Sequence, residues 1–170
     1  MIGKTRQEKA EIEEIFDPGA GRARGMLRRP VKAGKFRHSR RSPAPDLAHW
    51  IAHYWIISWD LRGCEPHYGE SLPHPNIHLV FGEGAATIHG VQTNKFERTL
   101  EGRSQVFGVK FRPGGFRPLY SGPISELADR STPASKILGD DIEKLGVTVL
   151  SPINEEEKIE AADAYFRQRL

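Results

Sequence analysis

Three of the chain's seven histidines, His74, His78 and His89, fall within sixteen positions. Imidazole nitrogens can bind a divalent metal, exchange protons near neutral pH, or act as ordinary polar groups that line a binding site. A metal site or a proton-transfer site needs the rings to converge, whereas a lining residue does not. The elements that carry these histidines therefore decide what chemistry is open to them.

The residues around the histidines predict a β-hairpin. Residues 77–81 (IHLVF) and 86–91 (ATIHGV) have the β-branched and aromatic composition of strands, and GEG at 82–84 is typical of the turn between them. Two of the three histidines then lie on paired strands, and the third precedes the first strand.

The length of the turn decides whether the two strand histidines meet. A turn of two or four residues places His78 directly opposite His89, with Cβ atoms about 4.5–5.5 Å apart, close enough to share a metal. His74 could then supply a third ligand. A turn of three residues would instead point His89 to the opposite face of the sheet.

Two other groups of residues could contact a ligand. Residues 53–61 (HYWIISWDL) predict a strand on which Trp55 and Trp59 share a face, either as an aromatic wall for a ligand or as core. Residues 112–118 (RPGGFRP) place Arg112 beside a Gly pair. This segment could bind an anion, although a tight turn that needs glycine explains it more simply.

The other strand signals lie in the middle of the chain. Residues 95–100 and 104–111 predict a second hairpin, and residues 64–71 a loop. Short helices are expected over 5–17 and, with Asp46 as N-cap, over 47–53.

Helical signals gather after residue 120. The first lies at 131–139, with Thr132 as N-cap and Gly139 as terminator, and the second at 140–146. Residues 151–170 begin with Asn154 and Glu157 at capping-box spacing. An apolar stripe then follows at helical spacing, made of Ile159, Ala162, Phe166 and Leu170. Strands followed by helices predict an α+β fold with an antiparallel sheet.

Composition narrows the class of protein. A chain of 170 residues suits one domain, and no apolar run approaches the roughly 18–20 residues of a membrane span. The single cysteine, Cys64, excludes an internal disulfide framework and suits a reducing cytoplasm. Residues 1–41 carry a net charge of +7. The basic segment 28–41 could contact phosphates, but its Pro and Gly residues favour a solvated arm.

Several motifs together resemble one family. HYWIISWDLRG, ESLPHPNIHLVF, IHGV, FGVKFRPGGFRPLY and SELADRSTPASKILGDDI occur in this order. The segment from about residue 25 to 170 is similar to the N-terminal domain of a branch of AraC-family transcriptional regulators. GVKFRPGG and LPHPN are the most specific parts of the resemblance, and residues 1–24 lie outside it.

The resemblance implies a cupin-like antiparallel barrel or sandwich followed by C-terminal helices. It divides the chain into an extra arm (1–24), a β-rich sensor domain (25–120) and a helical dimerisation or linker segment (121–170). A homodimer is expected, with an unidentified small-molecule effector and no membrane. DNA would be bound only through a C-terminal helix-turn-helix domain absent from this chain, because the chain's end suggests that more follows.

The resemblance also assigns roles to the candidate residues. Trp55, Trp59, His78, His89 and Arg112 become possible effector contacts. The stripe on the last helix becomes either the dimer seam or the surface that packs on the β-domain. No catalytic residue, cofactor or enzymatic activity is implied.

Two rival functions remain. A small cupin-like enzyme could use a metal bound by His74, His78 and His89, although metal-binding cupins have a His-x-His spacing and a Glu that this sequence lacks. A free-standing partner-binding module could instead dock its basic leader on nucleic acid.

Overall fold

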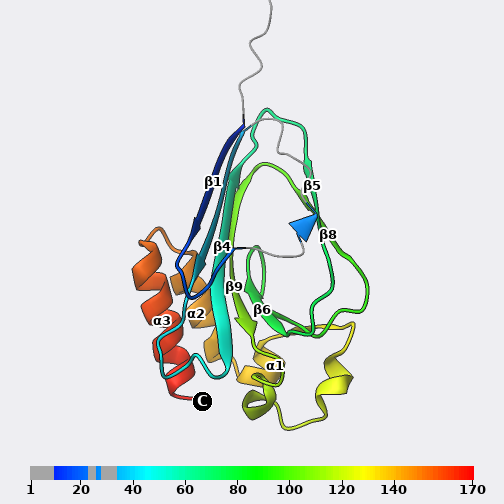
Figure 1. Ribbon diagram of the computed structural model, residues 1–170, viewed down its shortest axis with the longest axis vertical. Helices are drawn as coiled ribbons and strands as arrows, with labels where there is room; N and C mark the ends of the chain where they lie inside the picture. Colours follow the sequence, from blue (N-terminus) through cyan, green and yellow to red (C-terminus); the bar gives the residue numbers. More distant parts are fainter. Residues whose placement is uncertain (1–9, 23–25, 28–33) are drawn as a thin grey trace, which may run out of the picture.

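The computed structural model describes residues 10–22, 26–27 and 34–170, which form three layers (Figure 1). A large sheet lies in the middle, with helices on its outer face and a smaller sheet beside its inner face. The large sheet contains β1 (Glu11–Phe16), β3 (Lys35–Arg41), β4 (Ile51–Asp60), β6 (His78–Phe81), β7 (Thr87–His89), β9 (Arg103–Phe111) and β10 (Ser131–Pro133). The small sheet contains β2 (Met26–Leu27), β5 (His67–Ser71) and β8 (Phe96–Leu100).

The large sheet has the strand order β1-β3-β4-β9-β6-β7-β10, and the small sheet has the order β2-β5-β8. All neighbouring strands pair antiparallel except β1 and β3, which are parallel. The predicted α+β class, with a mostly antiparallel sandwich and C-terminal helices, is confirmed. The barrel form of that prediction is wrong, because the large sheet ends in two separate edges, β1 and β10.

Strand β4 shows how the sequence separates the two faces. Tyr54 and Ile56 belong to the core beneath the helices, whereas Trp55, Ile57 and Trp59 belong to a second apolar cluster on the inner face. Alternation along a strand sends successive side chains to opposite faces. The predicted strand at 53–61 is therefore confirmed, as is the shared face of Trp55 and Trp59.

The helical layer contains α1 (Ser135–Leu138), α2 (Asp141–Leu150) and α3 (Glu155–Arg167), preceded by the short turns η1 (Arg117–Leu119) and η2 (Ile124–Leu127). No helix in the described part of the chain is long and apolar enough to cross a membrane. Helix α2 runs past Gly146, where the sequence predicted its end. A Cβ on Gly146 would lie 3.1 Å from the Phe81 ring, so glycine lets the helix pack closely on the sheet.

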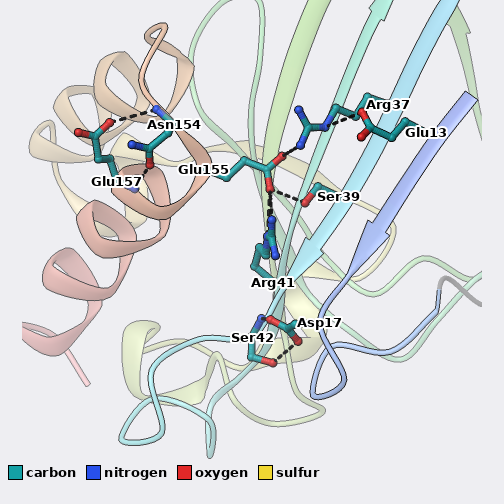
Figure 2. Close-up of polar contacts among 9 residues, drawn as sticks. All are labelled: Glu13, Asp17, Arg37, Ser39, Arg41, Ser42, Asn154, Glu155 and Glu157. Carbon is teal, nitrogen blue, oxygen red and sulfur yellow. Dashed lines mark hydrogen bonds and ion pairs between the residues drawn. The ribbon is translucent and has the colours of Figure 1, made fainter. Parts of the chain in front are cut away.

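Helix α3 begins as predicted. The Asn154 side chain accepts from the Glu157 N–H, and the Glu157 carboxylate accepts from the Asn154 N–H, which completes the capping box (Figure 2). Ala162 and Phe166 are fully buried in the protein's own core, and Ile159 and Leu170 pack against its edge. The stripe is thus the surface that packs on the β-domain, and it is not free to form a dimer seam in this conformation.

The helix predicted over 5–17 is wrong, because residues 11–16 form β1. The Ile and Phe spacing there suits a helix, but the charges of β1 match those of β3 across the parallel pair. Lys35 Nζ lies 3.3 Å from Glu11 Oε2, and Arg37 Nε lies 3.3 Å from Glu13 Oε2. Opposite charges on neighbouring strands favour their pairing. Residues 1–9 lie outside the described part of the chain.

The solvated arm predicted at 28–41 is wrong over residues 35–41, which form β3. Residues 28–33 lie outside the described ranges, so that part of the prediction is not addressed. The loop predicted at 64–71 is also wrong over residues 67–71, which form β5 and pair with β8.

The second predicted hairpin is wrong. Its strands exist, but β8 pairs with β5, whereas β9 pairs with β4 and β6. Residues 106–109 of β9 are all buried, which suits a central strand covered on both faces, while β8 is mostly exposed. The tight connection through Glu101 and Gly102 therefore joins two sheets.

Two predicted helix starts are also corrected. Residues 45–50 form turns instead of a helix, and the Asp46 carboxylate accepts from Arg167 Nε of α3 at 2.6 Å instead of capping. Residues 131–133, including the expected cap Thr132, pair with β7 as an edge strand. Helix α1 begins only at Ser135, and Gly139 ends it with φ 86° as expected.

Candidate functional site

A row of five polar residues crosses the inner face of the large sheet. His53 pairs with Lys110, Lys110 with His78, His78 with His89, and His89 with Ser131. Directly paired residues share a face of the sheet. We call these five residues the histidine row.

The row decides between the two hairpin registers that the sequence left open, in favour of a turn with an even number of residues. His78 lies opposite His89 and Leu79 opposite Ile88. His74 stays outside the row. Within residues 10–22, 26–27 and 34–170, no group of three or more His, Cys, Asp or Glu side chains is placed to hold a metal ion.

The ends of the histidine row are tied by hydrogen bonds. Arg40 Nη2, from β3, lies 2.9 Å from Nε2 and 3.1 Å from Nδ1 of His53. Arginine can only donate and a neutral imidazole has one acceptor nitrogen, so one of these two nitrogens accepts from Arg40 and the His53 ring is neutral. At the other end, Ser131 Oγ lies 2.9 Å from His89 Nδ1.

The side chains in the middle of the histidine row make fewer hydrogen bonds than those at its ends. Within the described residues, neither the Lys110 ammonium nor the His78 ring has a hydrogen bond or ion pair. His78 lies edge-on to Trp55, with ring centroids 6.3 Å apart. All three side chains are only partly buried, although the Nε1 atom of Trp55 is itself buried.

Burial and neighbouring cations keep the imidazoles neutral. Burial, together with the positive charges of Arg40 and Lys110, lowers the pKa of His53 to about 3. Burial and the positive charge of Lys110 likewise lower the pKa of His78 to about 3. The pKa of His89 is lowered by burial and by Arg98 of β8. The pKa of Lys110 itself is lowered by burial and by Arg40.

These pKa values predict that acid weakens the fold. Between about pH 6.5 and 3 the unfolded chain protonates His53 and His78 while the folded protein does not, so the free energy of unfolding falls as the pH falls. Each histidine contributes up to about 1.4 kcal/mol per pH unit in that window. Urea unfolding at pH 7 and 5.5 should show the loss.

The matched variants identify the histidines responsible. A His53→Gln/His78→Gln protein should lose less stability between pH 7 and 5.5 than the wild type, whereas the exposed His49→Gln control should lose as much. An equal loss in the double variant would exclude these two histidines as the cause.

An apolar region adjoins the histidine row on the same face. Trp59, Leu61, Leu100 and Val106 are buried there. Trp55 lies across Gly108, because a Cβ on that glycine would be 1.9 Å from the indole ring. The Trp55 Nε1–H is buried without an acceptor in the described structure, whereas Trp59 Nε1 donates to the Glu101 carbonyl at 2.9 Å.

The small sheet contributes two side chains from β8. The Phe96 ring lies edge-on to His89, with centroids 6.0 Å apart, and the Arg98 guanidinium lies 5.7 Å from the centre of the Trp59 ring. The inner face is therefore polar at the row and apolar beside it, and β8 lies over both.

Arg112 is not part of this face. Its Nε donates to the Ala48 carbonyl at 2.6 Å, and its own carbonyl accepts from the Gly115 N–H at 2.8 Å. Gly114 has φ 78°, which glycine adopts without strain. The RPGG segment forms the tight turn that the sequence allowed as its simpler explanation.

The outer face of β3 holds the start of α3. The Glu155 carboxylate accepts from Ser39 Oγ at 2.7 Å and from Arg41 Nε at 3.0 Å, and it lies 3.0 Å from Arg37 Nη2 (Figure 2). Arg37 in turn pairs with Glu13 of β1. We call Glu155 and its three β3 partners the Glu155 latch.

An open cleft of about 1740 Å³ lies beside the latch, between the sheet and the α2–α3 connection. Lys158 is 5 % exposed at its wall, and its Nζ donates to Gln105 Oε1 at 3.2 Å. Burial lowers the pKa of Lys158, although Glu155 opposes the shift. The Gln105 amide also donates to the Leu150 carbonyl, so this contact ties β9 to both helices.

Glu155→Gln should lower the free energy of unfolding by about 1.5–3 kcal/mol, because the hydrogen bonds to this carboxylate are charge-assisted. Glu156→Gln is the matched control, since Glu156 is exposed in the same helical turn. Chemical denaturation of both variants gives the comparison. Equal stabilities would show that the latch contributes nothing to the fold.

Sequence patterns found part of this site and missed the rest. Trp55, Trp59, His78 and His89 were expected to face a ligand, and all lie on the inner face. Arg40, His53 and Lys110 were not singled out, because their position depends on pairing between strands far apart in the chain. The alternation of Lys110 with the apolar residues of β9 was the available signal.

Comparison with known proteins gives one family. A domain of unknown function, DUF6597, matches residues 39–133. The matched segment contains Arg40 and the whole histidine row. Neither the curated proteins nor the solved structures yield a match.

Proposed function

The chain belongs to the DUF6597 domain family, and we propose that it is the effector-sensing and dimerisation domain of an AraC-type transcriptional regulator. A small molecule would bind on the inner face of the large sheet, between the two sheets. A C-terminal helix-turn-helix domain, attached after the helical layer, would bind DNA. The cupin likeness implied by the resemblance belongs to the same proposal.

The observation that carries the proposal is the double role of β3. Arg40 faces inward and reaches His53 of the histidine row, whereas Ser39 and Arg41 face outward and bind Glu155 of α3. A ligand that changes the position of Arg40 would act on the same strand that holds the last helix. Such a strand can connect effector binding to the C-terminal helices, provided that it has two arrangements with different ligand affinity.

The sequence motifs support the same interpretation. FGVKF lies on β9, the strand that carries Lys110, and LPHPN leads into β6, the strand that carries His78. The motifs that resemble AraC-type regulators therefore build the inner face itself.

Dimerisation needs a surface other than the apolar stripe of α3. Ala162 and Phe166 have no exposed area in the protomer, so they cannot contact a second copy without unfolding the core. The exposed side of the helical layer and the edge strands remain available. The homodimer is proposed on the strength of the resemblance.

A reporter fusion tests this function. Residues 1–170 would be joined to a DNA-binding domain that represses a reporter gene only as a dimer. Repression well above that of the DNA-binding domain alone supports pairing, and sedimentation of the purified chain gives an independent reading. A folded fusion that gives no added repression, together with a monomer in sedimentation, would contradict the proposal.

The rival metal-dependent enzyme has no comparable support in the geometry. It needs His74 to join His78 and His89, and the described residues contain no such group of three. Metal analysis of the purified protein, with His78→Ala and His89→Ala as controls, separates the two functions. Stoichiometric metal that both substitutions remove would favour the enzyme.

A further inference from the structure

The charges on the inner face near the histidine row are positive. The charged side chains that lower the pKa values of the row histidines are Arg40, Lys110 and Arg98. By register, Glu14 also falls on this face, opposite His38, but it is exposed on the edge strand β1. The middle of the row, at Lys110 and His78, therefore has positive charge without a carboxylate among its direct strand partners.

Two donors in this region have no partner within the described residues. The Lys110 ammonium has no acceptor in the described structure, and the buried Trp55 Nε1–H has none either. Leaving a buried donor such as the Trp55 N–H unpaired costs free energy that a ligand acceptor can recover. A carboxylate accepts hydrogen bonds at both oxygens. Its negative charge would also pair with the positive charge of Lys110.

The two donors are close neighbours on the sheet. Trp55 is paired with Gly108, which lies two residues from Lys110 on the same face of β9. The indole also contacts the His78 ring, and His78 is the direct partner of Lys110. One small anion could therefore reach all three side chains.

The surface next to these donors is apolar. Trp55, Ile57 and Val80 are partly buried, and they lie on the same face as the histidine row. Apolar walls with a few placed polar groups are typical of sites for small organic ligands. The face suits a molecule with one charged end and an apolar body.

We propose that the inner face binds a small organic monocarboxylate, with its carboxylate at Lys110, Trp55 Nε1 and His78 and its apolar body along Trp55, Ile57 and Val80. This inference rests on the proposed function, because it names the chemical class of the effector. A free phosphate is the less suitable anion, since an apolar wall gives it nothing to bind.

Calorimetric titration of the full chain at pH 7 tests the ligand class. The probes are benzoate, phenylacetate and hexanoate, each compared with its uncharged amide, together with inorganic phosphate. The carboxylates should bind and quench tryptophan fluorescence. Each amide should bind at least about tenfold more weakly, because it lacks the negative charge that makes the hydrogen bond to Lys110 charge-assisted.

Substitutions test the position of the site. Lys110→Met should weaken carboxylate binding about tenfold or more, whereas Lys110→Arg, which keeps the charge, should restore most of it. Arg112→Met is the control, because Arg112 is a cation outside the inner face. Circular dichroism confirms that each variant is folded.

Each other outcome overturns the carboxylate inference. Amides that bind as tightly as their acids would show that the ligand needs no negative charge. The proposed sensing function would be unaffected. Phosphate bound in a Lys110-dependent way, without any carboxylate, would show the wrong anion. Binding lost in Arg112→Met but kept in Lys110→Met would show the wrong site. The absence of binding by every probe would reject the monocarboxylate as the ligand class. A monomer that still binds benzoate would instead contradict the dimerisation role alone.

Discussion

Replacing Phe166 with alanine is expected to lower the free energy of unfolding by about 3–5 kcal/mol. The Phe166 side chain has no exposed area and lies edge-on to Phe111, with ring centroids 5.6 Å apart. Removing it leaves a cavity between α3 and the sheet that neighbouring side chains fill only partly. Since domains are stable by about 5–15 kcal/mol in all, this loss is large.

Urea unfolding of Phe166→Ala, beside Glu160→Ala on the exposed side of the same helix, measures the effect. The control should change little. The loss should not depend on protein concentration, because the contacts of Phe166 lie within one protomer. A loss below about 1 kcal/mol that grows on concentration would place the stripe in a dimer seam instead.

Gly108→Ala is expected to cost about 1–3 kcal/mol or more, as overpacking does. A Cβ at this position would lie 1.9 Å from Trp55 Cε2 and 2.1 Å from Trp55 Cζ2. The indole must therefore leave its place over β9, and carboxylate binding should weaken along with stability.

A double-mutant cycle tests the contact directly. In a Trp55→Ala background the added methyl group has no indole ring to clash with. The loss of unfolding free energy caused by Gly108→Ala should therefore largely disappear. Gly69→Ala is the matched control in a strand, because its Cβ would have its nearest neighbour at an ordinary 3.8 Å. Purely additive losses would show that Trp55 does not occupy the space over Gly108.

Local patterns predicted the local structure. The strands and turn around His78 and His89 follow from residues 77–91, and the cap of α3 follows from Asn154 and Glu157 alone. Both depend on residues close together in the chain. The sequence left two registers open for this hairpin, and one of them places His78 opposite His89 as the structure does.

Long-range pairing could not be predicted in this way. Strands β8 and β9 are adjacent in sequence but belong to different sheets, because burial on both faces selects β9 for the centre of the large sheet. Strand β1 has helix-like spacing and is held to β3 by charge pairs. The place of Lys110 in the histidine row follows only from the pairing of β9 with β4 and β6, which the sequence did not predict.

The Glu155 latch is similarly non-local. Its donors come from β3 and its acceptor from the first turn of α3, more than one hundred residues later. A basic segment such as 35–41 is typical of a solvated or nucleic-acid-binding arm. Here its outward arginines bind a carboxylate of the same chain, and its inward arginine reaches the histidine row.

A ligand bound on the inner face is proposed to change the contacts between β3 and Glu155 of α3. Amide hydrogen exchange of the chain, with and without a saturating bound carboxylate, measures this directly. We predict changed protection in β6 and β9, in β3, and in the first turn of α3 at residues 155–158. The same ligand on Glu155→Gln should leave the α3 amides unchanged. Protection that changes at β6 and β9 but not in α3 of the wild type would contradict the account, because the site would then bind without signalling.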